Sequence, residues 1–122
     1  MDALDEALDR QDPAAVAALF TDDRSVTFWG SAISEEAIGR AAIRALFTSV
    51  GSWGTFSLTY GDRRVTSRGD VAWVNASGSA KWERAGHDTL HLPYRLTAIF
   101  VREGDVWRWH THHGSEPSPD EG

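Results

Sequence analysis

The chain contains no cysteine. This absence excludes a disulfide scaffold, a thiolate zinc site and a cysteine nucleophile. Basic residues are also few, because 12 of them face 18 acidic residues and give a formal net charge of −6 at pH 7. A nucleic-acid-binding protein normally carries a basic face, so nucleic acid is not an expected partner.

Long apolar runs are missing as well. No stretch approaches the roughly 18 apolar residues of a membrane-spanning helix, so no membrane partner is expected. The first ten residues, MDALDEALDR, lack the basic start and apolar run of a targeting signal, which predicts a cytoplasmic protein. All of the basic residues except Lys81 are arginine, which is typical of a GC-rich bacterial genome.

What the chain does contain is typical of one globular domain. It has 122 residues, of which 41% are hydrophobic and 25% are charged. This length supports a single core without disulfides or bound metal ions. We expect the domain to cover residues 1–117 and the acidic, proline-containing end, 118–122, to be disordered.

Helices are predicted in the first half, at 2–11, 13–20 and 36–50. Asp12 is a good N-cap and Pro13 suits the first turn of the second helix. Apolar residues at helical spacing define the third helix, although Gly39 interrupts it.

From Gly51 onward the apolar residues alternate with a period of two, which predicts strands. An early strand is expected at 25–29, and a meander of four antiparallel strands at 55–67, 71–83, 89–102 and 106–114. Segregated helices and strands indicate an α+β fold, with a long curved sheet and a cavity on its helix-covered side.

Four short segments carry a resemblance to a known family. They are GRAAIR (39–44), DVAWV (70–74), LPYRLT (92–97) and HGSEP (113–117). With these four segments in this order, the chain resembles the SnoaL-like branch of the nuclear transport factor 2-like superfamily. The resemblance implies a cone-shaped α+β fold, with a curved antiparallel sheet, N-terminal helices on its concave face and a homodimer formed through its outer face.

The resemblance does not select a chemistry. The superfamily includes ketosteroid isomerases, scytalone dehydratase and polyketide cyclases, and also non-enzymes such as transport factors. When the chain is laid against the isomerases, the catalytic aspartate falls at Phe28 or Trp29 and the oxyanion tyrosine near Leu4, so the isomerase apparatus is missing. Glu35 or Glu36 could reach in as a base, or could simply be favourable charges at a helix N-terminus.

The candidate site follows from strand alternation and from the family's closing histidine. We predict that Arg95 and His113 lie together in the cone as catalytic groups, if the turn at 103–105 is a three-residue loop; a two-residue turn would put them on opposite faces. The predicted ligand-binding residues are Trp29, Trp53, Trp73, Asn75, Thr97, Trp109 and Ser115. The alternative is structural, with Arg95 paired to an acidic residue and His113 capping its strand.

His110 and His112 could share a face and bind one metal ion, but no third ligand is apparent, so no metal site is predicted. The glycines form no nucleotide-binding fingerprint, and no cofactor is expected.

The leading function is therefore binding of a small hydrophobic or aromatic ligand in the cone, with isomerisation, dehydration or cyclisation as the candidate reactions. The alternative is a non-catalytic binding or oligomerisation module. The even-numbered residues of 90–100 are apolar enough to predict that this face packs against a second subunit.

Overall fold

The computed structural model describes residues 12–32, 34–50 and 55–118, which form two helices and six strands. In chain order these are α2 (Pro13–Ala18), β1 (Thr27–Trp29), β2 (Glu36–Ile38), α3 (Arg40–Val50), β3 (Thr55–Arg68), β4 (Val71–Glu83), β5 (Leu90–Glu103) and β6 (Val106–Ser115). The helix predicted at 2–11, the tail at 119–122 and Trp53 lie outside the described residues.

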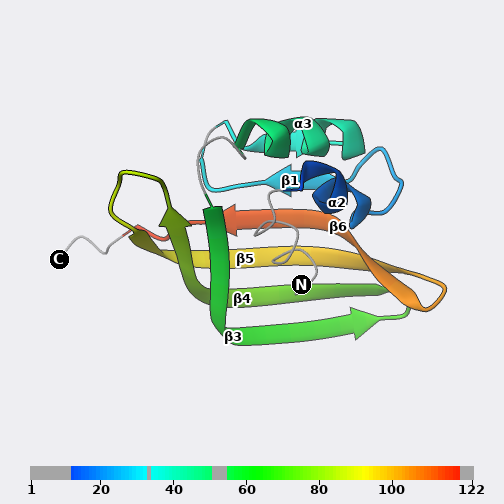
Figure 1. The fold of residues 1–122 in the computed structure, drawn as a ribbon. Helices are drawn as coiled ribbons and strands as arrows, with labels where there is room; N and C mark the ends of the chain where they lie inside the picture. Colours follow the sequence, from blue (N-terminus) through cyan, green and yellow to red (C-terminus); the bar gives the residue numbers. More distant parts are fainter. Residues whose placement is uncertain (1–11, 33, 51–54, 119–122) are drawn as a thin grey trace.

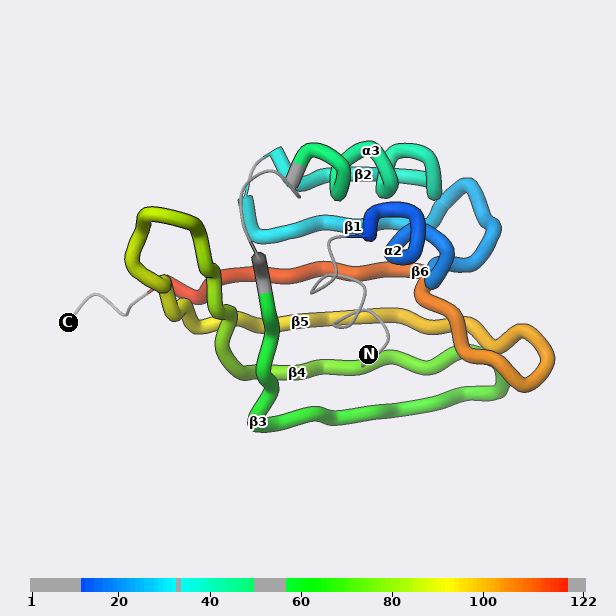
Figure 2. Tube along the Cα trace, in the orientation of Figure 1, coloured from blue at the N-terminus to red at the C-terminus, as the bar shows by residue number. Residues whose placement is uncertain are grey.

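The strands form one curved, open sheet in the order β2-β1-β6-β5-β4-β3 (Figures 1 and 2). Neighbouring strands are antiparallel except β1 and β6, which run parallel. The α+β fold and the four-stranded meander predicted from the sequence are confirmed. The predicted count of four to five strands is one too low, because a short strand, β2, was read as helix.

Residues 36–38 pair with β1 rather than opening the long helix, so the prediction of helix over 36–50 is wrong at its start. The physical reason is Gly39, whose φ of +89° breaks the chain direction between β2 and α3. Its neighbour Arg40 donates two hydrogen bonds, of 2.9 and 2.7 Å, to the carbonyl oxygen of Phe20 and fixes the start of α3 beside the end of α2.

The shorter helix begins as its sequence predicts. Asp12 accepts a hydrogen bond of 3.1 Å from the amide of Ala15, and Pro13 occupies the first turn. Both helices cover the same face of the sheet at its β1–β2 end (Figure 1). None of the helices in the described part of the chain is long and apolar enough to cross a membrane.

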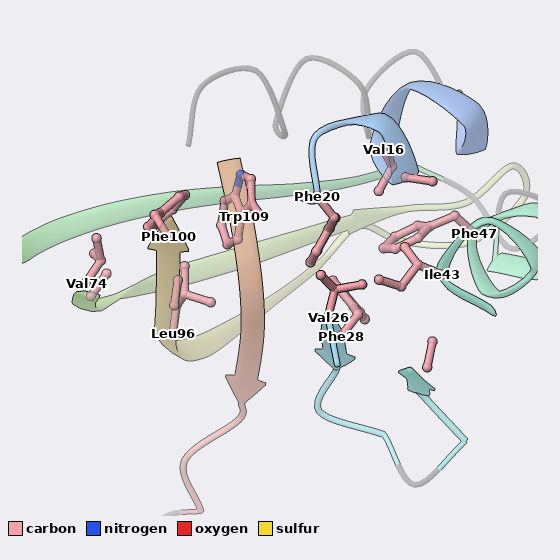
Figure 3. Close-up of a cluster of buried hydrophobic side chains, with 14 residues drawn as sticks. Val16, Phe20, Val26, Phe28, Ile43, Phe47, Val74, Leu96, Phe100 and Trp109 are labelled. Carbon is pink, nitrogen blue, oxygen red and sulfur yellow. The ribbon is translucent and has the colours of Figure 1, made fainter. Parts of the chain in front are cut away.

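The core lies between these helices and the sheet (Figure 3). Val16 and Phe20 from the α2 segment and Ile43 and Phe47 from α3 meet apolar residues of the strands. We call the covered side of the sheet the concave face; it carries Val74, Ala76, Leu96, Ala98, Phe100 and Trp109. The opposite side is called the outer face.

The face assignments of the central strands differ from the prediction. The even-numbered residues of β5, such as Leu96 and Ala98, are buried in the core, so they do not form the subunit contact predicted for them. The odd-numbered residues, such as Arg95 and Thr97, lie on the outer face instead. The alternation of side chains along β5 was predicted correctly, but the helices cover its even-numbered residues and leave its odd-numbered residues open.

The β5–β6 hairpin turns through two residues, 104–105. The prediction that such a turn separates Arg95 from His113 is wrong, because β6 holds an extra, unpaired residue at His110. This bulge restores the parity, so that both side chains lie on one face. It also brings both Trp109 and His112 onto the concave face.

Candidate functional site

The structure brings most of the predicted site residues together on the outer face. In the register of β4, β5 and β6, Asn75 pairs with Thr97, Thr97 pairs with His113, and Arg95 pairs with Ser115. The prediction that these five residues lie inside the cone is wrong, because all of them are exposed on the face that the helices leave open. Their roles in catalysis and ligand binding stay predictions, and these now concern the outer face.

Arg95 lines a shallow groove of about 240 Å³ on this face, beside the bulge of β3. Asp62, Arg64 and Thr97 also line it, and the hydroxyl of Thr97 donates a hydrogen bond of 3.3 Å to the Asn75 side chain. The groove is open and most of the residues that line it are polar or charged, so it does not enclose a ligand as most small-molecule sites do.

Two of the predicted tryptophans also lie on the outer face. Trp29 is 43% exposed and contacts the ring of His113 edge-to-face, with 5.5 Å between the ring centroids. Trp73 is half-buried, and the Arg68 guanidinium lies 6.0 Å from its ring. Trp109, in contrast, is buried on the concave face as predicted.

The concave face carries a histidine that the sequence reasoning placed only among candidate metal ligands. His112 is 1% exposed and stacks on Phe28, with ring centroids 4.3 Å apart, while Trp109 lies 5.4 Å away. Its Nδ1 atom is buried and has no hydrogen-bond partner. Leaving a buried polar atom unpaired is costly, and such an atom in a native fold needs an explanation.

The imidazole of His112 is neutral at physiological pH. Burial lowers the pKa of His112 from 6.5 to about 3, and the carbonyl groups of His112 and Trp29 oppose this shift only in part. A neutral imidazole has one donor nitrogen and one acceptor nitrogen. His112 can therefore form a hydrogen bond with a ligand, but it cannot take up a proton near pH 7.

Two oxygen-bearing side chains also lie on the concave face. Glu35 is half-buried, and burial raises the pKa of its carboxyl group, with the charge of Glu116 acting in the same direction and the Ala32 amide opposing it. Tyr94, in the LPYRLT segment, is 4% exposed. The alternation of β5 could have indicated Tyr94 as a concave residue, whereas no local signal distinguished Glu35 from a helix-capping charge.

Nothing in the described ranges gathers three metal-ligating side chains of the His, Cys, Asp or Glu type. His110 lies 2.9 Å from the Ser25 hydroxyl, whereas His112 stacks on Phe28 in the core. The two histidines thus make separate contacts and do not converge.

A curved, open sheet with helices over its concave face, where aromatic rings and a buried histidine lie, is the α+β arrangement that the sequence predicted. The family model of the SnoaL-like domain matches residues 1–119. The chain therefore belongs to the SnoaL-like domain family. A comparison with curated proteins gave no match.

Solved structures share this fold at low identity. A protein from Novosphingobium aromaticivorans, provisionally named an aromatic ring hydroxylase, is 24% identical, with a TM-score of 0.82 over 98% of this chain and 85% of that chain. A provisionally named dehydratase from Streptomyces avermitilis is 19% identical, with a TM-score of 0.83 over 97% and 92%. A superfamily member from Salmonella enterica is 18% identical, with a TM-score of 0.81 over 99% and 87%. These similarities establish the fold alone.

Proposed function

We propose that this protein binds a small, mainly apolar or aromatic ligand against the concave face of its sheet. The observation that carries the proposal is the buried, unpartnered Nδ1 atom of His112. A ligand that supplies the missing hydrogen bond would offset the cost of burying this atom. The rings of Phe28 and Trp109 beside it favour an aromatic body for the ligand.

The basicity of His112 limits its chemistry. With a pKa of about 3 it holds a carbonyl or hydroxyl group in place and does not exchange a proton with it. A dehydration, isomerisation or cyclisation would require a second group for proton transfer, for which Glu35, half-buried and with a raised pKa, is our candidate on this face. The low basicity of His112 also favours the second candidate function, a non-catalytic binding module.

Acetophenone, an uncharged aromatic ketone, tests the proposal in a methyl NMR titration. We expect the methyl signals of Ala98 and Leu96 on the concave face to shift, and that of Thr97 on the outer face to stay unchanged. His112→Phe should weaken acetophenone binding by about tenfold, the value of one lost hydrogen bond.

His113→Phe is the matched control, because it changes the neighbouring histidine on the opposite face. It should leave acetophenone binding unaltered. Shifts confined to Thr97 and its neighbours, or equal affinity in the His112→Phe variant, would contradict the proposal.

We further propose that the outer face packs against a second copy of the chain. Trp29 and Val71 are 43% and 39% exposed there, and Trp73 and Ile99 are half-buried. Exposed apolar side chains gathered on one sheet face favour an interface. Light scattering on the purified protein should give twice the mass of one chain, and Trp73→Arg should lower it; a monomeric wild-type protein at micromolar concentration would refute the dimer.

A further inference from the structure

The polar end of the outer face carries an acid and a base on either side of one strand. In the register of β3, β4 and β5, Asp62 pairs with Ser77, and Ser77 pairs with Arg95. All three residues line the groove on this face. Neighbouring strands lie about 4.8 Å apart, so the positions of Asp62 and Arg95 are separated by about 10 Å, with Ser77 midway between them.

These two charged groups are available to a partner. Within the described part of the chain, Arg95 makes no ion pair and no hydrogen bond. The Oδ2 atom of Asp62 lies 3.7 Å from Nε of Arg64, and both of these side chains are more than half exposed. A carboxylate accepts several hydrogen bonds, so this long contact leaves Asp62 able to accept more.

A two-fold axis can exchange the positions of the acid and the base. When two copies of a sheet pack face to face, an axis that runs between them along β4 places β3 of each copy over β5 of the other. Packed sheets lie about 10 Å apart and keep their strands within about 30° of each other. Asp62 of each copy then faces Arg95 of the other, so the same attractive pair occurs twice in the interface.

Four rows of paired side chains cross the outer face from β3 to β6, and they favour this axis. Two rows are polar, and the other two hold Val71, Trp73, Ile99 and Val101 at their centre. An axis along β4 leaves each row opposite its own copy, so polar residues meet polar ones and apolar residues meet apolar ones.

Other axes match the two copies less well. An axis along β5 would place Arg95 opposite its own copy, and like charges in contact repel each other. An axis across the strands, at the middle of the four rows, would place polar residues such as Asn75 opposite apolar ones such as Trp73. Burying polar groups against apolar partners is costly.

We propose that two copies of the chain associate about an axis along β4, with Asp62 of each copy paired to Arg95 of the other. This inference rests on the proposed dimer and adds the groups that fix its register. Complementary charges across an interface contribute mainly to register and specificity, which is the role that this pair would have.

Two charge-reversing substitutions test the register by sedimentation equilibrium. Asp62→Arg and Arg95→Asp should each raise the dissociation constant of the dimer at least about tenfold, because two like-charged contacts replace two attractive pairs. Both positions are exposed, so the variants should fold as the wild type does.

An equal mixture of the two variants gives the decisive measurement. In a mixed dimer the introduced arginine faces the introduced aspartate, and Arg95 of one chain faces Asp62 of the other. The mixture should therefore associate with a dissociation constant within about threefold of the wild-type value.

Asp88→Arg and Arg24→Asp are the matched controls, because they make the same charge changes at exposed loop positions outside the strands. They should leave the dissociation constant unchanged, alone and when mixed. Equal weakening by these controls would assign the effect to net charge and overturn the register.

The outcomes separate this inference from the proposed dimer. If the wild type is a dimer and both single variants keep its dissociation constant, the register is wrong while the dimer stands. The register is equally wrong if the two variants do not associate when they are mixed. A monomeric wild-type protein refutes both proposals.

Discussion

Replacing His112 by phenylalanine should make the protein less sensitive to acid. Burial lowers the pKa of His112 to about 3 from 6.5. Between these values the unfolded chain binds a proton that the folded protein does not, so the free energy of unfolding falls as the pH is lowered. From pH 8 to about pH 4.5 this one residue should remove about 3 kcal/mol, at 1.36 kcal/mol per pKa unit.

The same substitution should also affect stability where His112 is neutral in both states. An unsatisfied buried polar atom costs about 1–3 kcal/mol. Phenylalanine keeps the ring that stacks on Phe28 but is slightly larger, and the resulting strain opposes the gain. At pH 8 we expect His112→Phe to be more stable than the wild type by about 1 kcal/mol.

Urea unfolding of both proteins at several pH values measures these effects. The difference between the two curves isolates His112, because Glu35 is present in both proteins. Burial raises the pKa of Glu35, which adds stability at low pH and therefore acts against His112. His113→Phe, at the exposed neighbouring position, is the control and should not reproduce the effect of His112→Phe. Parallel curves for wild type and His112→Phe would refute the assignment of a buried, neutral imidazole.

Three further outcomes are expected. Gly114→Ala should destabilise the protein by about 1–3 kcal/mol in urea unfolding, because the added Cβ atom would overlap the Tyr94 hydroxyl. Gly61→Ala is the control and should change the free energy of unfolding by less than about 0.5 kcal/mol, because nothing lies within 4 Å of its added Cβ atom. Equal effects of the two substitutions would contradict the close approach of Tyr94 to Gly114. Arg95→Met should change the free energy of unfolding by less than about 0.5 kcal/mol, since Arg95 is exposed, and a larger loss would assign it a structural role. An assay with a β,γ-unsaturated ketosteroid should show no turnover above background, because the resemblance predicts that Phe28 or Trp29, neither of which can transfer a proton, falls where the isomerases have their base. Clear turnover would show that another group, such as Glu35, transfers the proton.

The sequence determined most of the elements and their order. The change to a period of two after Gly51 predicted the meander of β3 to β6, and Asp12 with Pro13 predicted the start of α2; both are confirmed. These features depend on neighbours in the chain, through side-chain alternation and capping, so they can be read locally. The four family segments carried a resemblance to the SnoaL-like family, and the family model confirms that resemblance.

A three-residue segment shows where local patterns fail. Residues 36–38 precede a helix and contain residues that helices accept, so they were predicted as part of it. They form a strand because β1 offers a pairing partner and Gly39 turns the chain at a φ of +89°. Pairing with a distant segment outweighs the local preference.

The tertiary structure alone decided which face of the sheet the helices cover. Alternation shows that Arg95 and Leu96 point in opposite directions, but only the packing of α2 and α3 shows that Leu96 faces the core. The bulge at His110 then reverses the parity within β6, so Trp109 and His112 share the concave face although one is odd and the other even. A bulge bends its strand to fit the curvature of the whole sheet, and no short stretch of sequence encodes that curvature. For this reason only the folded chain showed that His112 lies on the concave face.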